Sequence, residues 1–105
     1  MPQFGVHRNS NAATRAAFPF LLDVQSDLVA DLATRVVVPL CPASVMKGKL
    51  VRTLMPTFGI EGRQYAMITP QLAGISAKQL GARVADLSGK RGEIVAALDL
   101  LFTGI

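Results

Sequence analysis

The sequence is poor in the residues that build catalytic and metal sites: it has one cysteine, one histidine and no tryptophan. A single cysteine, Cys41, excludes a disulfide within the chain, and its apolar neighbours favour a small core residue over a nucleophile. A zinc site or a Ser–His–Asp arrangement would have to be built around His7 alone. Because His7 alternates with Phe4 and Val6, it is expected to be an exposed or edge histidine on a strand. We therefore expect no metal and no cofactor.

Long apolar runs and phosphate-binding glycine patterns are also missing. No stretch reaches the ~18 apolar residues of a membrane span, and the first ten residues lack the apolar run of a signal peptide. Gly59, Gly62 and Gly74 do not fit the spacing of a phosphate-cradling loop. These absences predict a cytoplasmic protein that does not enter a membrane.

Charged residues are scarce as well, at 17% of the 105 residues, whereas half of the chain is apolar. That length and composition predict one folded domain spanning residues 1–105. With so few charges on a small surface, apolar groups must be left exposed or be covered by a second copy. We therefore expect self-association, most simply as a homodimer.

The net charge of +4 and the pI near 9.9 are typical of nucleic-acid-binding proteins. The distribution argues otherwise, because lysine and arginine are spread along the chain from Arg8 to Arg91. The densest basic group is Lys47, Lys49 and Arg52, and no aromatic residue interleaves with it to stack on a base. We interpret this group as a solvated basic loop and do not expect autonomous binding of nucleic acid.

Most of the chain is patterned as short strands, in which β-branched or alternating apolar residues are bounded by turn formers. Two apolar runs flank the turn-forming Glu61-Gly62-Arg63 and predict a hairpin. A β-branched run just before Pro39 predicts a strand that ends there. The expected strands cover residues 3–8, 18–25, 36–38, 55–60 and 64–68, while residues 75–84 are interpreted as a loop with a short strand at 82–84.

The apolar period changes after Ser88, a residue type that caps helix N-termini. Gly104 is suited to end a helix, because glycine adopts the left-handed conformation at low cost. Between them, apolar residues recur three or four apart, as on one helical face: Ile94, Leu98, Leu101 and Phe102. The expected architecture is a run of short antiparallel strands followed by one C-terminal helix.

Two polar features remain. Asp99 lies in the last helical turn, where a negative charge opposes the helix dipole, so a partner contact and simple solvation are both open. Strand alternation places Asp23, Gln25 and Asp27 on one face, as a solvent edge or a hydrogen-bonding surface. No group of residues forms a catalytic constellation, so the sequence favours a binding protein over an enzyme.

The same polar block carries a resemblance that extends in order along essentially the whole chain. The matching segments are Asp23-Val24-Gln25-Ser26-Asp27-Leu28, Arg35-Val36-Val37-Val38-Pro39-Leu40, Val84-Ala85-Asp86-Leu87-Ser88 and Leu101-Phe102-Thr103-Gly104-Ile105. In these segments the sequence resembles the CcdB family, the toxins of plasmid and chromosomal toxin–antitoxin modules.

The resemblance implies a mainly β fold, an SH3-like antiparallel barrel with one C-terminal helix, assembled as a homodimer. It also implies binding to the A subunit of DNA gyrase and trapping of the enzyme on cleaved DNA, with no reaction catalysed by the toxin. The family's gyrase-contact positions correspond to seven residues of this sequence: Leu28, Val29, Asp99, Phe102, Thr103, Gly104 and Ile105.

One departure concerns Thr103, because the best-known family member carries a tryptophan there that grips an arginine of gyrase. Threonine removes the cation–π surface and most of the apolar area. The family pattern also has asparagine where this sequence has Asp99.

The resemblance further implies a CcdA-like antitoxin, whose disordered C-terminal segment folds onto the toxin dimer. DNA would be reached only indirectly, through gyrase or through the antitoxin complex. The candidate antitoxin contacts are the polar block and the basic group, although the block could equally hydrogen-bond within the fold: Asp23, Gln25, Ser26, Asp27, Lys47, Lys49 and Arg52.

Two alternatives stay open. MazF-like and Kid-like endoribonuclease toxins share the implied fold, but such an enzyme needs acid–base groups around a phosphate, and His7 with scattered arginines gives no such group. The other alternative is a harmless chromosomal relative that binds antitoxin and has lost toxicity through Thr103.

Overall fold

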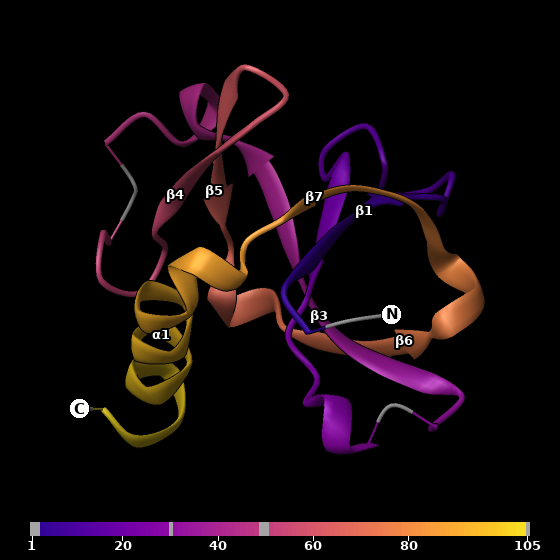
Figure 1. Cartoon of the computed structure of the whole chain (residues 1–105). Coiled ribbons are helices and arrows are strands. Elements are labelled where there is room, and N and C mark those ends of the chain that lie inside the picture. The colour runs from indigo at the N-terminus through magenta and orange to yellow at the C-terminus, as the bar shows by residue number, and fades with distance from the viewer. Residues whose placement is uncertain (1–2, 30, 49–50, 105) are drawn as a thin grey trace.

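The computed structural model describes residues 3–29, 31–48 and 51–104 and shows a mainly β chain that ends in one helix (Figure 1). All strand pairs are antiparallel, and the strand order is β4-β5-β3-β2-β1-β7, with β6 paired to β3 beside this path. The sheet curls as an open half-barrel, and the predicted fold class is confirmed. The elements are β1 (Gly5–Asn9), β2 (Phe20–Asp23), β3 (Thr34–Pro42), β4 (Thr57–Ile60), β5 (Arg63–Met67), β6 (Ala73–Ser76), β7 (Leu80–Asp86) and α1 (Arg91–Thr103).

Within residues 3–29, 31–48 and 51–104, five short 3-10 turns connect these elements. Within the part of the chain that is described, no helix is long and apolar enough to cross a membrane. The turns are η1 (Asp27–Val29), η2 (Ala43–Met46), η3 (Thr69–Gln71), η4 (Ala77–Gln79) and η5 (Ser88–Lys90).

The core lies on one face of the sheet, where α1 packs. Val6, Leu22 and Val38 are aligned across β1, β2 and β3, and none of the three is exposed. Ile94 and Ala97 of α1 are also completely buried and belong to the same apolar cluster. The helix therefore docks on the sheet through the first half of its length and leaves its C-terminal end free to project.

Pro39 does not end its strand, contrary to the prediction, because β3 continues to Pro42. In an antiparallel ladder the N–H and C=O of one residue point to the same side. The carbonyl of Pro39 accepts a hydrogen bond from the N–H of Ile68 at 3.0 Å, so the missing N–H of Pro39 faces that side too. There the partner of β3 changes from β6, whose pairing with β3 stops at Val37, to β5, whose pairing with β3 starts at Leu40, so Pro39 lies between the two ladders.

The predicted hairpin is confirmed as β4 and β5, with Ile60 opposite Arg63. The two turn residues, Glu61 and Gly62, have φ values of 50° and 81°. Two successive positive φ angles match the turn geometry that best fits the twist of a two-residue hairpin, and glycine takes the second position without strain.

Two strands differ from the sequence-based expectation. β6 covers part of the segment that was interpreted as a loop, and β7 is longer than the short strand expected at 82–84. Both are rich in alanine and glycine and only partly buried, so they carry little of the apolar alternation that marks a strand.

The helix also begins and faces differently from the prediction. Ser88 lies in η5 and does not cap α1, whose N-cap is Lys90 without a side-chain hydrogen bond. Gly104 ends the helix as predicted, with φ 73° and its N–H donating to the carbonyl of Leu100. Phe102 is 67% exposed and does not share the buried face of Ile94. Phe102 is rotated by about 80° around the helix from Ile94 at 3.6 residues per turn, and it lies beyond Ala97, the last completely buried residue of α1.

Candidate functional site

The polar block that follows β2 is built around a buried ion pair. Asp23 is completely buried, and its Oδ2 accepts hydrogen bonds from Arg35 Nη2 at 2.7 Å and from Arg35 Nε at 2.9 Å. Its Oδ1 accepts from the N–H of Gln25 at 3.1 Å. A charge so deeply buried is tolerated because it is paired and hydrogen-bonded. Arg35 was not predicted as a partner of Asp23, since nothing local in the sequence links residues 12 positions apart.

The solvent-edge interpretation of this block is wrong for two of its three residues. Asp23 and Gln25 are buried, and only Asp27 is exposed, because β2 ends at Asp23 and the strand alternation does not reach Asp27. The hydrogen-bonding interpretation is the one that the geometry supports, since Gln25 donates to the carbonyl of Val29 and accepts from the N–H of Val36. A contact of these residues with an antitoxin stays a prediction.

The segment between β2 and β3 forms a projecting loop, which we call the tip loop and define as residues 26–33, with residue 30 outside the described residues. Leu28 is 95% exposed, Val29 47% and Leu32 56%. Two side chains of the loop hold its backbone. Ser26 Oγ accepts from the N–H of Leu28 within the loop, and Asp27 Oδ1 accepts from the N–H of Gln3 outside it. The result is three large apolar side chains held out in water.

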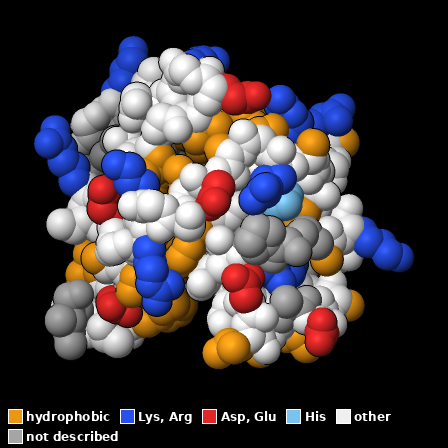
Figure 2. Space-filling model, viewed as in Figure 1, with side chains coloured by type: hydrophobic (Ala, Val, Ile, Leu, Met, Phe, Trp, Pro, Cys, Tyr) orange, Lys and Arg blue, Asp and Glu red, His pale blue; other side chains and the backbone are white. Residues whose placement is uncertain are grey.

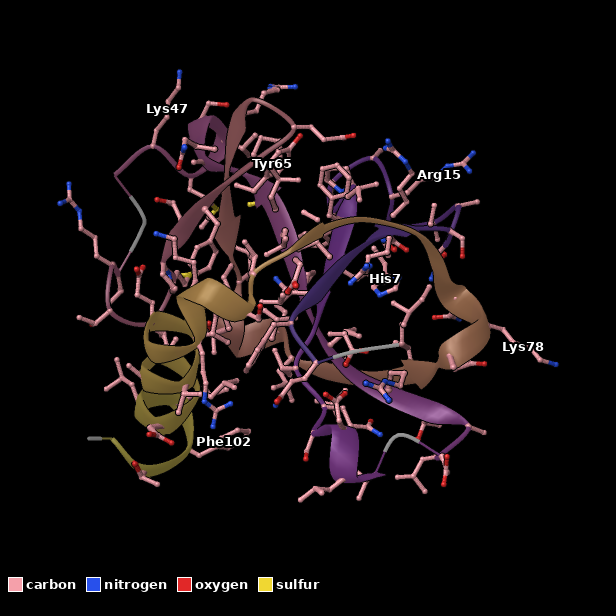
Figure 3. All side chains as sticks on the ribbon, in the orientation of Figure 1. His7, Arg15, Lys47, Tyr65, Lys78 and Phe102 are labelled. Carbon is pink, nitrogen blue, oxygen red and sulfur yellow. The ribbon has the colours of Figure 1, made fainter. Side chains whose placement is uncertain are left out.

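The end of α1 forms the second part of the candidate site. Phe102 is exposed, and Figure 3 shows it projecting from the end of the helix. Thr103 is exposed and turns its hydroxyl back onto the helix, donating to the carbonyl of Asp99 at 2.7 Å. Asp99 and Gly104 are exposed as well, and Ile105 lies outside the described residues.

Both parts lie at the lower edge of the molecule in Figure 1, and Figure 2 shows a hollow between them with apolar surface on the side of α1. The structure thus brings the described members of the predicted gyrase-contact set to one end of the molecule. Leu32 was not predicted, although its exposure matches that of its neighbours.

The basic group lies elsewhere. Lys47 is exposed and stands at the upper edge in Figure 3, opposite Phe102 in this view, and Arg52 is also exposed, whereas Lys49 lies outside the described residues. A groove of about 440 Å³ separates this segment from α1. Its lining combines apolar and charged side chains: Arg52, Thr53, Pro56, Glu93, Ala96 and Leu100.

The two residues with the most reactive side chains are buried. His7 is only 4% exposed, contrary to the prediction, because it lies between β2 and β7, and its Nδ1 is 3.1 Å from the carbonyl oxygen of Gly81. Cys41 is buried as predicted, and burial raises the pKa of its thiol, which disfavours the nucleophilic thiolate. Among the described residues, no three His, Cys, Asp or Glu side chains lie together as a metal site.

A comparison with protein-family models connects this geometry to known proteins. The model of the CcdB protein matches residues 3–104, which is nearly the whole chain and includes the polar block, the tip loop and all of α1. The match covers far more than half of the sequence and agrees with the mainly β fold and its C-terminal helix. The chain therefore belongs to the CcdB family, the toxins of toxin–antitoxin modules.

Proposed function

We propose that this protein poisons DNA gyrase by binding the gyrase A subunit and trapping the enzyme on cleaved DNA. The observation that carries the proposal is the exposure of Leu28 and Phe102 at one end of a chain of the CcdB family. A leucine that is 95% exposed contributes nothing to the core, so we expect it to become buried only against a partner.

Side chains of this kind are those that dominate protein interfaces. Large apolar residues that become fully desolvated on binding carry most of the binding free energy, and their neighbours mainly exclude water. Thr103 cannot act as such an anchor, because it is small and its hydroxyl is already bonded to the carbonyl of Asp99. Phe102, with its aromatic ring in solvent, therefore takes the main role at the end of α1.

The charge of the two segments also suits a basic partner. The chain carries a net charge of +4, yet residues 16–34 and 92–105 contain no lysine or arginine. The exposed carboxylates of Asp27 and Asp31 lie on the tip loop, and that of Asp99 lies on the last turns of α1. An acidic rim around an apolar centre favours the approach of a positively charged surface and repels a negatively charged one.

The remaining family properties belong to the same proposal. The toxin acts in the cytoplasm as a homodimer and is neutralised by a CcdA-like antitoxin, whose acidic segment suits Lys47, Lys49 and Arg52. The protein catalyses no reaction itself. The burial of Cys41 and of the one histidine supports this part, because neither side chain is available to a substrate.

The test at the level of the target is a comparison of two bacterial strains that express the chain, one with normal gyrase and one whose gyrase A subunit resists this toxin class. We expect killing only in the first strain. Equal killing in both would contradict the proposal and favour an endoribonuclease, to be assayed by RNA cleavage. Survival of both, with the folded protein present, would favour a harmless relative that only binds antitoxin.

The test at the level of residues is Phe102→Ala, with Val45→Ala as the matched control. Val45 is 69% exposed, close to the 67% of Phe102, but lies in η2. Phe102→Ala and deletion of Gly104-Ile105 should each abolish killing and leave the melting temperature and antitoxin binding unchanged. Killing at the wild-type level by both Phe102→Ala and the deletion variant would show that the gyrase-contact surface has been placed wrongly.

A further inference from the structure

We propose that Gln25 is a positioning residue of the gyrase-contact surface, which it serves by tying the two ends of the tip loop together so that Leu28 projects in a fixed direction. This inference rests on the proposed function. Gln25 itself is only 7% exposed, so it acts through the loop and makes no contact with the partner.

The side-chain amide of Gln25 bridges the loop. Its Nε2 donates to the carbonyl of Val29, at the end of η1, at 2.7 Å. Its Oε1 accepts from the N–H of Val36, at the start of β3, at 2.9 Å. Since one group must donate and the other accept, only an amide of this length satisfies both contacts; glutamate cannot donate and methionine can do neither.

The ion pair beneath holds Gln25 itself. Asp23 Oδ1 accepts from the N–H of Gln25, and Arg35 Nη2 lies 3.5 Å from the carbonyl oxygen of Gln25. The main chain of Gln25 is thus fixed on both of its polar groups by two fully buried charged side chains. The ion pair thus holds Gln25 in place, and Gln25 in turn holds the tip loop.

The loop needs such support because it has no core of its own. η1 is three residues long and buries none of them. The direction of Leu28 is therefore set by hydrogen bonds to the main chain of the loop. The N–H of Leu28 donates to Ser26 Oγ, the N–H of Val29 donates to the carbonyl of Ser26, and the carbonyl of Val29 accepts from Gln25 Nε2. An unsupported loop would have to be ordered by the partner, and that entropy would be subtracted from the affinity.

The first measurement is amide hydrogen exchange in the free protein, with wild type, Gln25→Met and Asn9→Leu. Asn9 is the matched control, because it is also 7% exposed and its amide also ties a loop, through Thr14 Oγ1 and the carbonyl of Phe18. We expect the amides of Leu28 and Val29 to exchange about tenfold faster in Gln25→Met and at the wild-type rate in Asn9→Leu. Unchanged exchange in Gln25→Met would overturn the proposal.

The second measurement is a double-mutant cycle on binding to purified gyrase A subunit. In the wild type, Leu28→Ala and Phe102→Ala should each weaken binding about tenfold. In the Gln25→Met background, Leu28→Ala should weaken binding about twofold or less, whereas Phe102→Ala should keep its full effect. Only Leu28 depends on the hydrogen bonds of the Gln25 side chain. Simple destabilisation of the fold would lower the active fraction and leave both ratios unchanged, which would overturn the positioning role.

Ser26→Ala removes the cap on Leu28 without touching a buried residue, so it tests independently of Gln25→Met whether an ordered tip loop gives Leu28 its effect. It should reproduce the selective loss of the Leu28 effect. If neither Leu28→Ala nor Phe102→Ala weakens binding in the wild type, the proposed function fails and the role of Gln25 in it fails too. The exchange rates would then still show separately whether Gln25 orders the loop.

Discussion

The two faces of the central strands β1, β2 and β3 differ in one respect. On the apolar face, Val6, Leu22 and Val38 stand opposite one another and are completely buried in the main apolar cluster. The other face, which we call the polar face, also buries Leu21 and Val37, but it carries the ion pair of Asp23 and Arg35 as well. The buried ion pair is therefore the feature that distinguishes the two faces.

Magnitudes separate the apolar side chains from the ion pair. Each aliphatic side chain on the apolar face stabilises the fold by about 1.5–3 kcal/mol through burial alone. A buried ion pair has no such surplus, since the cost of desolvating two charges offsets most of their attraction. The apolar side chains therefore supply the stability, and the ion pair on the polar face supports the tip loop, whose residues lie between Asp23 and Arg35 in the sequence.

The largest expected effect comes from breaking the ion pair on one side. Asp23→Ala leaves the Arg35 guanidinium buried without its counter-charge and should lower the free energy of unfolding by about 3–5 kcal/mol, measured by urea denaturation. The double variant Asp23→Leu with Arg35→Met should recover most of that stability, yet bind gyrase more weakly than the wild type. If the double variant remains as unstable as the single one, the polar face is a stabilising element after all.

The next effect is on the apolar face. Leu22→Ala should lower the free energy of unfolding by about 2–5 kcal/mol, because it removes buried methyl groups and leaves a cavity. The affinity of the folded fraction for gyrase A subunit should stay at the wild-type value. A loss of affinity per folded molecule would show that the two faces are not separable in function.

A smaller effect is expected where β7 closes on β1. A Cβ at Gly81 would lie 2.8 Å from the carbonyl oxygen of Arg8, so Gly81→Ala should destabilise the protein by about 1–3 kcal/mol through forced movement of the backbone. Gly74→Ala is the matched control, since nothing lies within 4 Å of its Cβ position. Thermal unfolding of the two variants measures the difference; equal melting temperatures would mean that β7 can shift freely.

The smallest effect is electrostatic and lies outside both faces. The backbone N–H and the side chain of Ser88 both donate to the Asp86 carboxylate and lower the pKa of that carboxyl, and the backbone bond has the larger effect. Because the pKa is lower in the folded state, the carboxylate stabilises the fold at pH values above its unfolded-state pKa of about 4. This stabilisation is lost as the pH falls through the folded-state pKa. Asp86→Asn should melt slightly below wild type at neutral pH, and the two curves should converge in acid. A difference that persists unchanged at low pH would contradict this assignment.

Features determined by neighbouring residues were predictable from the sequence. The hairpin followed from Glu61-Gly62, and the end of α1 followed from Gly104, because glycine in these places answers a local need for positive φ. The strand through Pro39 and the strand β6 were not predictable in the same way. They depend on which distant strand lies alongside, and that is decided by the whole sheet.

The site shows the same division. The family resemblance indicated Leu28 and Phe102, and both are exposed at one end of the molecule. The internal role of Asp23 could not be read from the sequence, because its partner Arg35 is 12 residues away and the alternation suggested a solvent edge. The prediction for His7 was wrong for a related reason: a strand pattern places it on a face, but only the tertiary fold shows that β1 lies between β2 and β7 and that His7 is buried.

The most direct test of the central claim is to incubate purified gyrase and plasmid DNA with the protein and then measure the DNA that is cleaved and covalently bound to the gyrase A subunit. The wild type and Val45→Ala should accumulate linear, gyrase-linked DNA, and Phe102→Ala should reduce it by about tenfold or more. Absence of such DNA with the folded wild-type protein, or equal amounts with Phe102→Ala, would contradict the account.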